Sequence, residues 1–464
     1  MKILVAIANY GSGSRQYVDK VMQTYREMSH DVDLVILSNI PKNMGEDVEV
    51  IVGLPSKNPW SLPFGHKKLF AERIDDYDLF IYSEDDILVS EHAIDAFIQA
   101  TPHLNPDEIA GFMRVEYEPD GRVSYDMVHS FYRWDASTVC ERNGELYAWF
   151  SNEHAAAYIL TRDQLQRSID SGGFLVEPYE HRYDLLCTAA TDPYTSCGMT
   201  KLINLSRIED FFIHHLPNKY LGVYGIHDDA MKVQIDALRK AARGELQPEV
   251  LFEVETRLPE SRASKMIYAK ADPDLLGAVG HDAKDILVVG AGHGELEAEL
   301  TQRGHRVSAV PVDSVIGHAL SNRGITTLPA DLDRSCQALA GQQFDTLIFP
   351  ESLHLFEDPV AALKSYRTFL KPGGKLLCTC PNLGNINVRR SRLKGEPGFA
   401  SLGDFSATGT HYTTRGTAAG WLKKAGFNRI QSNPLMTRKR AKYNRLSLGL
   451  ASGLLASRWL IQAA

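Results

Sequence analysis

The sequence predicts an α/β protein made of two domains, each built around a mostly parallel sheet. With 464 residues, the chain is too long for one ordinary hydrophobic core. Short apolar runs alternate with helical stretches in both halves, which is the pattern of βαβ units. A charged stretch that holds Pro248 and Pro259 separates the two series and predicts a domain boundary within residues 244–262.

The elements of the first half follow from apolar runs and the helical stretches between them. Short apolar runs predict strands at Ile3–Ala8, Asp33–Leu37, Val48–Val52, Leu79–Tyr82 and Ala155–Leu160. Helical patterns predict helices at Arg15–Met28, His66–Ile74 and Arg162–Ser171, the last one closed by two glycines. This alternation predicts a sheet whose strands run mostly parallel.

The second half starts a new series after a helical linker, which we expect at residues 226–262. Asp228 and Asp229 begin a polar helix at His227–Arg243, and Gly244 ends it. Residues 263–464 then form the second domain. Its predicted strands are Asp285–Val289, Arg306–Val310, Phe344–Phe349 and Lys375–Cys380, with helices ending at Gln302 and spanning Pro359–Leu370.

The C-terminal tail has two interpretations. Arg438, Lys439 and Arg440 precede an apolar stretch at Leu446–Leu455, which is typical of a basic amphipathic contact with a membrane surface. Alternatively, the tail is a helix followed by a last strand, Trp459–Ala463, that completes the second sheet.

Composition excludes several classes of protein. The formal net charge of −8 and the pI near 6.1 argue against a general nucleic-acid binder. The six cysteines have no zinc-finger spacing, so we expect buried thiols in a reducing cytoplasm. The first residues lack the apolar core of a signal peptide, and no long uninterrupted apolar run predicts a spanning helix. We therefore expect a cytoplasmic protein, with the tail as a candidate for contact with the inner face of the membrane.

Three consecutive carboxylates follow the predicted strand Leu79–Tyr82. Ligand sites of open α/β sheets lie beyond the carboxyl ends of the strands. Glu84, Asp85 and Asp86 repel one another there, and a bound cation relieves that repulsion. Hard oxygen ligands suit Mg²⁺ or Mn²⁺, which usually bridge protein carboxylates to substrate phosphates. The sequence thus indicates a metal–diphosphate site, and a solvated acidic turn is the alternative.

This acidic motif after an apolar strand resembles the GT-A class of nucleotide-sugar glycosyltransferases, over residues 1–225. In that class the last acid of the motif binds the Mn²⁺ or Mg²⁺ that holds the donor diphosphate. The resemblance implies Asp86 as the primary metal ligand, with Glu84 and Asp85 around the metal or on the ribose. It also implies a nucleotide-sugar donor and a glycan or lipid-linked glycan acceptor.

The same resemblance implies a histidine ligand and a catalytic base. His215 or His214, near the end of the domain, completes the metal coordination, although a histidine pair also has structural roles. An acid after the Gly-Gly-Phe turn deprotonates the acceptor in inverting members, which makes Asp184 and Glu180 the candidates. Glu153, which precedes the turn and adjoins His154, is a third possibility. A helix-capping acid is the alternative.

Polar residues beyond other predicted strands are candidate contacts to the nucleotide. The resemblance places the base of the nucleotide near the ends of the first two strands and the diphosphate near the helix before the acids. The residues concerned are Asn9, Tyr10, Ser38, Asn39, His66 and Lys67, each of which is otherwise an ordinary loop or surface residue.

The second domain resembles class I S-adenosylmethionine-dependent methyltransferases. The resemblance rests on a strand followed by Gly290, Gly292 and Gly294, on the turn 371–374 before a later strand, and on Ala425-Gly426-Phe427. Glycines let the backbone approach a cofactor closely, and the start of the next helix supplies free N–H groups. The resemblance implies S-adenosylmethionine as a cofactor bound by these three glycines.

One feature departs from that family. Active members usually carry an acid at the end of the second strand, where it bonds both ribose hydroxyls, and this position falls on Pro311. Proline has no side-chain acceptor, so Asp313 is the candidate replacement. Loss of such a contact costs on the order of 2–4 kcal/mol of binding, or roughly a hundredfold in affinity. The domain is therefore either a weak methyltransferase or an inactive scaffold.

Together the resemblances predict two Rossmann-like α/β domains, a GT-A glycosyltransferase fold followed by a class I methyltransferase fold. The function they imply is a metal-dependent glycosyltransferase of surface polysaccharide biosynthesis with an appended methyltransferase-like domain. Two alternatives stay open. One is an S-adenosylmethionine-dependent methyltransferase of a glycan whose N-terminal domain binds the glycan. The other is a non-catalytic scaffold.

Overall fold

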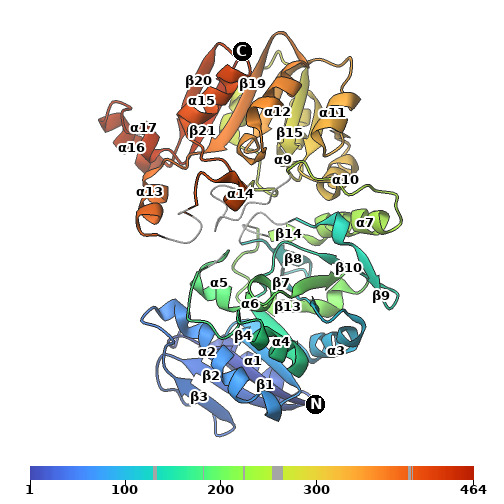
Figure 1. Cartoon of the computed structure of the whole chain (residues 1–464), viewed down its shortest axis with the longest axis vertical. Helices are drawn as coiled ribbons and strands as arrows, with labels where there is room; N and C mark the ends of the chain where they lie inside the picture. Colours follow the sequence, from blue (N-terminus) through green and yellow to red (C-terminus); the bar gives the residue numbers. More distant parts are fainter. Residues whose placement is uncertain (129–132, 181, 223–224, 253–264, 396–398, 400) are drawn as a thin grey trace. The chain divides into compact units, whose positions relative to one another are not determined.

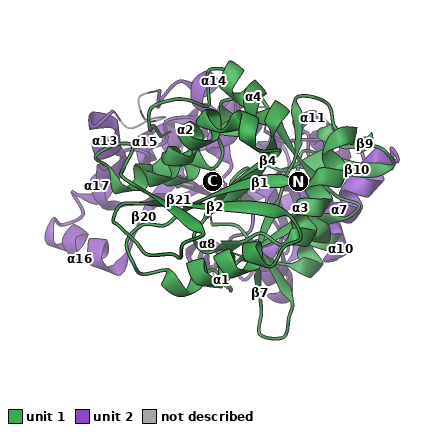
Figure 2. Ribbon diagram, turned by 90° about the horizontal axis from the view of Figure 1, so that it is seen from below, with its two compact units in different colours: residues 1–128, 132–232 green, residues 129–131, 233–464 purple. Residues whose placement is uncertain are grey.

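The structure is a computed structural model, and it describes residues 1–128, 133–180, 182–222, 225–252, 265–395, 399 and 401–464. The chain divides into two compact units, coloured separately in Figure 2. Unit 1 comprises residues 1–128 and 132–232, and unit 2 comprises residues 129–131 and 233–464. The helix α7, Asp228–Ala242, contains the point of division, and residues 253–264 of the predicted linker lie outside the described residues.

Unit 1 begins with a five-stranded sheet in the order β11-β4-β1-β2-β3. β1, β2, β3 and β4 run parallel and β11 runs antiparallel beside β4, so the prediction of a mostly parallel sheet is confirmed. The central strands consist of apolar residues because both faces are buried. The strands are β1 (Lys2–Ala8), β2 (Asp31–Ser38), β3 (Val48–Val52), β4 (Leu79–Glu84) and β11 (Ala157–Thr161).

Helices accompany this sheet and make its core continuous. Val18, Val21, Met22 and Tyr25 of the first helix are buried in the same hydrophobic core as the strands. Thr161 starts another helix with a capping box to Gln164, which explains the abrupt turn after β11. The helices of unit 1 are α1 (Arg15–Arg26), α2 (Gly65–Glu72), α3 (Glu91–Ala100), α4 (Arg162–Asp170), α5 (Leu185–Ala189) and α6 (Asp192–Thr195).

Two smaller mixed sheets complete unit 1. One has the order β6-β12-β10-β9 and the other β14-β8-β7-β13-β5. The second of these sheets includes β5, a strand of two residues that directly follows Asp86 of the acid motif. The strands are β5 (Ile87–Leu88), β6 (Glu108–Ala110), β7 (Met113–Tyr117), β8 (Val123–Asp126), β9 (Cys140–Arg142), β10 (Glu145–Trp149), β12 (Thr200–Asn204), β13 (Phe212–His215) and β14 (Gly225–His227).

Unit 2 contains a seven-stranded sheet in the order β17-β16-β15-β18-β19-β21-β20, seen in the upper part of Figure 1. The first five strands are parallel, and β21 runs antiparallel between β19 and β20. The strands are β15 (Asp285–Ala291), β16 (Arg306–Pro311), β17 (Thr326–Thr327), β18 (Phe344–Pro350), β19 (Leu370–Pro381), β20 (Ile430–Leu435) and β21 (Arg458–Ala463). The last strand is therefore inserted into the sheet rather than added at its edge.

Alternation along β15 places its side chains in two different cores. Leu287 and Val289 pack with α12 and α15, whereas Ile286 and Val288 pack with α8, α9 and residues of α10. Helices thus cover both faces of the sheet, as the apolar strands require. The helices are α8 (Pro273–Ala278), α9 (Glu295–Gln302), α10 (Ser314–Asn322), α11 (Leu332–Ala338), α12 (Pro359–Arg367), α13 (Ile386–Leu393), α14 (Phe405–Thr408), α15 (Arg415–Lys424), α16 (Arg438–Leu446) and α17 (Ser452–Leu455).

The direction of the chain through this sheet reverses at β15. From β15 the chain proceeds outward to β16 and β17, and it then returns to place β18 on the other side of β15. In open α/β sheets the crevice at such a switch point, outside the carboxyl ends of the strands, is where ligands bind. The residues after β15 and β18 are therefore the ones that matter for function in unit 2.

Candidate functional site

The acid motif lies at the carboxyl edge of the parallel sheet of unit 1. β4 pairs with β1 in register, so that Glu84 lies beside Ala8 at the end of both strands. Asp85 and Asp86 form the turn between β4 and β5. This is the placement that the sequence predicted for the three acids.

Polar residues at the end of β1 contact this motif. The Asn9 side-chain amide donates to Asp85 at 2.6 Å, and Lys42 donates to the carbonyl oxygen of Asn9 at 2.7 Å. Asn9 is 4% exposed, and both bonds are partly buried. Asn9 was a candidate from the sequence, whereas Lys42 follows β2 in a loop without any motif and was not.

The neighbouring loops carry the other candidate nucleotide contacts. Asn39 accepts a hydrogen bond from the Gly11 amide at 2.7 Å, and Ser38 accepts one from the Ile40 amide at 3.2 Å. Both side chains therefore shape their own loops. Tyr10 is half exposed at the same edge and is open to solvent.

His215 joins the acid motif to a second buried carboxylate. Its Nε2 lies 3.4 Å from the Asp86 carboxylate, and its Nδ1 lies 2.5 Å from Glu116. The Tyr220 ring stacks on the imidazole at 5.1 Å between centroids, and the Tyr220 amide donates to Glu116 at 3.0 Å. A carboxylate on each side holds the imidazole in one orientation.

His214 does not join this group. Adjacent residues of a strand point to opposite faces, so His214 on β13 faces away from His215. Its Nε2 lies 3.1 Å from the Asn218 side-chain oxygen, and its ring meets the edge of Tyr117 at 4.8 Å. The structure therefore brings only His215 of the two histidines to Asp86.

The protonation of the acids reflects their burial. Burial raises the pKa of Glu84 to about 8 and the pKa of Asp85 to about 6. Burial also favours the neutral form of Asp86, but the hydrogen bond and charge of His215 outweigh it and lower the pKa of Asp86. The same bond, with the one to Glu116, raises the pKa of His215 despite its burial. The Asp86–His215 pair is thus stabilised in its charged form.

The three candidate bases occupy different environments. Glu153 is buried, and Arg182 donates to it at 3.4 Å. Its neighbour His154 lies 3.6 Å from Glu84, which connects this segment to the acid motif. Asp184 is exposed and caps α5 by accepting from the Cys187 amide at 2.9 Å, and Glu180 is exposed. Of the three candidates, Glu153 is therefore the one whose neighbour, His154, lies near the acid motif.

His66 and Lys67 lie in the core of unit 1. The His66 ring packs against Phe70, Tyr82, Tyr158 and Phe174, and burial lowers its pKa well below the usual range. Lys67 forms a buried ion pair with Asp192. Both side chains are enclosed by protein, so in this structure they do not reach the acid motif.

In unit 2 the glycine loop follows β15 at the switch point of the sheet. Gly290 has φ +80° and makes a β-bulge between Val289 and Ala291, and Gly294 has φ +100° at the start of α9. A Cβ on Gly292 would lie 2.4 Å from the Ile267 carbonyl oxygen. Glycine at this position is thus required by the approach of another part of the chain.

That other part is residues 265–268, called here the covering segment. The His293 amide donates to the Ile267 carbonyl at 2.8 Å, and the Lys265 ammonium donates to the Pro350 carbonyl at 2.6 Å. Tyr268 donates to Gln234 at 3.2 Å. The covering segment therefore lies on the glycine loop and on the end of β18, and no sequence motif predicted this contact.

The end of β16 is covered as well. Asp313 is 2% exposed and caps α10 by accepting from the Ile316 amide at 2.8 Å. Leu251 donates to the Val312 carbonyl at 2.9 Å, and Ile267 packs with Val312 and Ile316. Asp313 is thus at the expected edge of the sheet, but its carboxylate is enclosed.

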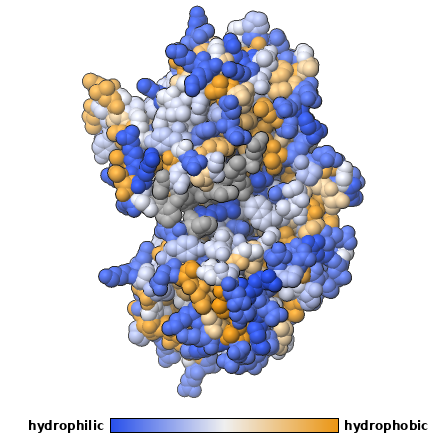
Figure 3. All heavy atoms as spheres, in the orientation of Figure 1, coloured by the Kyte–Doolittle hydropathy of each residue, from blue (hydrophilic) through white to orange (hydrophobic). Residues whose placement is uncertain are grey.

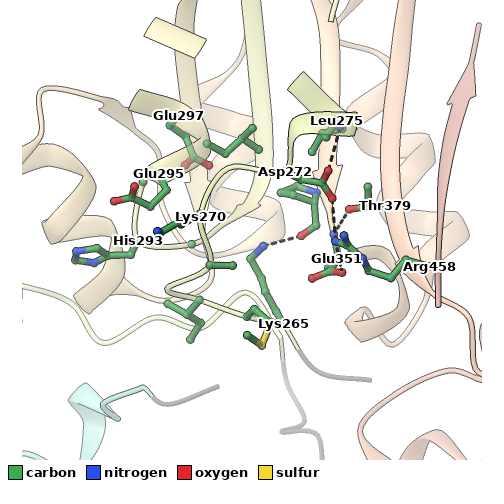
Figure 4. A pocket seen from close by; sticks show the side chains of 17 residues that line it. Lys265, Lys270, Asp272, Leu275, His293, Glu295, Glu297, Glu351, Thr379 and Arg458 are labelled. Carbon is green, nitrogen blue, oxygen red and sulfur yellow. Dashed lines mark hydrogen bonds and ion pairs between the residues drawn. The ribbon is translucent and has the colours of Figure 1, made fainter. Parts of the chain in front are cut away.

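Two adjoining cavities open beside the covering segment. Figure 4 shows the side chains that line the smaller one. The smaller, about 70 Å³, touches Gly292, Gly294, Glu297 and Lys265. The larger, about 600 Å³, lies beyond β19. Both are lined by Asp272, Glu351 and Arg458, and the guanidinium of Arg458 lies 2.9 Å from Asp272 and 3.1 Å from Glu351. In Figure 4 this charged trio faces Glu295 and Glu297 across the smaller cavity.

Glu297 is an unusual member of the first turn of α9. It is 1% exposed, and burial raises its pKa to about 7. Its Oε1 has no hydrogen-bond partner among the residues that the structure describes. A carboxyl group that is buried with one oxygen unpartnered is costly when charged, so burial favours the protonated form of Glu297 up to near-neutral pH.

Two general features of the described residues bear on function. Within those residues, no group of three or more His, Cys, Asp and Glu side chains is arranged to hold a metal ion. No helix within the same residues is both long enough and apolar enough to cross a bilayer.

Among the comparisons with known proteins, the family match lies in unit 2. A family described as "Methyltransferase domain" matches residues 245–432, which confirms the prediction of a methyltransferase domain in this part of the chain. A stretch of 124 residues is 29% identical to a ubiquinone biosynthesis O-methyltransferase of Cereibacter sphaeroides, and covers 26% of this chain and 50% of that protein. A relative from another strain of the same species is 28% identical over 123 residues. The chain spans about half the length of the curated relatives it matches.

Solved methyltransferase structures also resemble the chain. One from Mesorhizobium loti has 19% identity and a TM-score of 0.30, with 41% of this chain and 95% of that chain covered. Another from Archaeoglobus fulgidus has 12% identity and a TM-score of 0.32, with 39% and 86% covered.

Proposed function

We propose that unit 2 is an S-adenosylmethionine-dependent methyltransferase that acts on a hydroxyl group of a glycan. The observation that carries the proposal is the match of residues 245–432 to a methyltransferase domain. The glycine loop supports it, because it lies at the switch point where α/β sheets bind ligands. The curated relatives are O-methyltransferases by name, which supports a hydroxyl acceptor.

The larger cavity supports a hydroxyl-rich acceptor. Asn385, Asn387, Ser457 and Arg440 line it together with the charged trio at Arg458. Amides, hydroxyls and paired charges both donate and accept hydrogen bonds, as recognition of several hydroxyl groups requires. The volume of about 600 Å³ lies within the range that small-molecule sites occupy.

The cofactor does not fit beside the glycine loop in the conformation described. Ile267 lies directly on Gly292, and the adjoining cavity of about 70 Å³ is far below the roughly 300–1,000 Å³ of ligand pockets. The proposal therefore requires the covering segment to move before the cofactor binds. When only a fraction of the molecules is open, the apparent affinity for the cofactor is reduced in proportion to that fraction.

Calorimetric titration of the full chain with S-adenosylmethionine and with S-adenosylhomocysteine tests the proposal. We expect both to bind, and Lys265→Met to bind S-adenosylmethionine more tightly, by about fivefold, because one hydrogen bond that holds the closed segment is lost. Lys364→Met, at an exposed position of α12, is the matched control. Absence of binding by the unaltered chain at millimolar concentrations overturns the proposed activity, and weaker binding by Lys265→Met overturns the closure.

We propose a second function for unit 1, that of a metal-dependent GT-A glycosyltransferase. The observation that favours it is the contact of Asp86 with His215 beyond the parallel strands, with Glu116 behind the imidazole. Glu116 contacts Nδ1 of His215, and Nε2 faces Asp86. A carboxylate on one ring nitrogen is the arrangement that orients a histidine whose other nitrogen binds a metal ion. With this activity, unit 1 would supply the glycan that unit 2 methylates.

Binding of Mn²⁺ or Mg²⁺ by Asp86 and His215 depends on the nucleotide-sugar donor, which supplies further ligands. Asp86 and His215 are two ligands rather than three, in agreement with the absence of a three-residue group among the described residues. Such ions are commonly held by one or two protein carboxylates together with substrate phosphates and water. When bound, the ion neutralises the charge on the leaving diphosphate. Glu153 is the candidate base that we favour over Asp184 and Glu180, because it adjoins His154.

Thermal shift of the full chain with UDP-, GDP-, CMP- and dTDP-sugars, each with and without Mn²⁺, tests this second proposal. We expect one nucleotide sugar to raise the unfolding temperature of unit 1 only when Mn²⁺ is present. Stabilisation that is equal without the metal, or stabilisation by none of the donors, contradicts it.

A further inference from the structure

The end of the chain exposes leucines in a way that the two units do not account for. Leu446, Leu448 and Leu450 are 75%, 91% and 90% exposed. No residue of α16 or of α17 is buried, so these helices contribute nothing to the core of unit 2. Clustered exposed apolar residues on a soluble protein generally mark an interaction site.

A fourth leucine belongs to the same side of unit 2. Leu393, the last residue of α13, is 88% exposed. The start of α13 and α16 share the larger cavity, through Asn385 and Arg440. The Asn382 side chain, just before α13, donates to the Gly453 carbonyl of α17 at 2.9 Å. Figure 1 shows α13, α16 and α17 on the same side of unit 2, and Figure 2 shows α17 between α13 and α16.

Basic residues surround these leucines. The segment from Met436 to Ala464 contains no Asp or Glu, whereas the whole chain has a net charge of −8. Figure 3 shows the apolar tip at the place of α16 and α17, with strongly hydrophilic residues next to it. The exposed cations are Arg389, Arg390 and Arg392 of α13, and Arg438, Lys439, Lys442 and Arg445 of α16.

We propose that this surface, called here the tail surface, binds the anionic face of a phospholipid bilayer. It is formed by Leu393, Leu446, Leu448 and Leu450 with the seven cations just named. Leucines enter the boundary between headgroups and acyl chains, and cations beside them attract acidic headgroups. This inference is independent of either proposed function.

Charge decides between a bilayer and a second copy of the chain. A symmetric contact between two tail surfaces brings their cations together, and like charges oppose such a contact. An anionic bilayer offers both an apolar interior for the leucines and a complementary charge for the cations. The rest of the chain has a net negative charge, which an anionic membrane repels, whereas the tail surface is attracted. The protein therefore approaches such a membrane with the tail surface toward it.

Co-sedimentation of the full chain with vesicles tests the inference. We expect the protein to sediment with vesicles of 70% phosphatidylcholine and 30% phosphatidylglycerol, and severalfold less with phosphatidylcholine alone. Binding should fall as NaCl rises from about 50 to 500 mM, because salt screens the attraction. Equal binding to both vesicles, or to neither, overturns the inference.

Two substitutions locate the contact. Leu448→Asp with Leu450→Asp should reduce the bound fraction at least fivefold, since each leucine would be replaced by a charge that the membrane repels. Leu175→Asp, at an exposed leucine of unit 1, is the matched control and should leave binding unchanged. An unchanged unfolding temperature of the double variant shows that its fold is intact, as expected for side chains outside the core.

Light scattering identifies the competing occupant. We expect the unaltered chain and the double variant to have the same mass in solution without lipid. A dimer that becomes a monomer on Leu448→Asp and Leu450→Asp would assign the tail surface to a second copy and overturn the membrane assignment.

Discussion

The two units carry their distinctive residues at the same place, the carboxyl edge of parallel strands, but fill that edge differently. In unit 1 the edge beyond β1 and β4 holds polar and charged side chains that contact one another, as the Asn9 amide donates to Asp85 and His215 lies close to Asp86. In unit 2 the edge beyond β15 and β18 holds glycines that are covered by backbone, through the Ile267 carbonyl.

This difference shows what a motif does and does not determine. A glycine loop makes close approach possible for any group, whether a cofactor or another segment of the chain. An acid cluster cannot be filled in the same way, because enclosing it without cations or donors is costly. A glycine edge can thus be closed by the chain, whereas an acidic edge favours a cationic ligand.

The largest effect is expected from removing the charge at the acidic edge. Asp86→Ala should weaken Mn²⁺ binding by at least about 100-fold, because a charged ligand contributes on the order of 3 kcal/mol. Asp76→Ala, at an exposed acid before β4, is the control and should bind the ion as the unaltered chain does. Titration calorimetry with Mn²⁺ measures both, and equal affinities would remove the contrast between the two edges.

The second effect concerns the buried carboxyl of unit 2. Burial raises the pKa of Glu297 in the folded chain to about 7, above its ordinary value of 4.5. Between these two values the folded state keeps a proton that the unfolded state loses, so the stability of unit 2 falls as pH rises. Glu297→Gln removes this dependence and should stabilise unit 2 by up to about 3 kcal/mol at pH 8, but little at pH 5.

Differential scanning calorimetry of the unit 2 transition at the two pH values provides the measurement. Glu299→Gln is the control, because Glu299 lies on the exposed side of α9 and pairs with Arg303. If Glu297→Gln changed the stability of unit 2 equally at pH 5 and pH 8, Glu297 would be hydrated or paired in solution.

The smallest effects compare two glycines of unit 2. Gly292→Ala should destabilise the unit by about 1–3 kcal/mol, because the new methyl group meets the Ile267 carbonyl at 2.4 Å. Gly420→Ala, inside α15 with no atom within 4 Å of the added group, should stabilise it by about 0.5–1 kcal/mol. Chemical denaturation followed by circular dichroism measures both. Two variants of equal stability would indicate that the covering segment does not rest on the glycine loop in solution.

Much of the fold was predictable because strands and helices have different sequence periods. The apolar runs that predicted β1, β3, β4 and β18 lie within the observed strands, and the capping and glycine signals located α4 and α7 to within two residues. Strand ends were predicted less well. β15 continues through Gly290 because a bulge, rather than a strand end, accommodates the left-handed glycine.

The partners of the candidate residues were not predictable in the same way. Lys67 had the sequence context of a surface residue, but its partner Asp192 is far along the chain, and the pair is buried. His214 and His215 were equivalent as letters, and only the pairing of β13 shows which one faces Asp86. Long-range pairing decides such cases, because local periodicity contains no information on which distant segment packs against a residue.

The sequence by itself determined that there are two α/β series, and that one edge carries acids and the other glycines. Tertiary structure decided that Glu116 supports His215, that Asp313 is enclosed, and that residues 265–268 lie on the glycine loop. The reason is physical. Strand and helix formation depends on the order of neighbouring residues, whereas the opening or closing of a site depends on which distant groups satisfy its hydrogen bonds and fill its space.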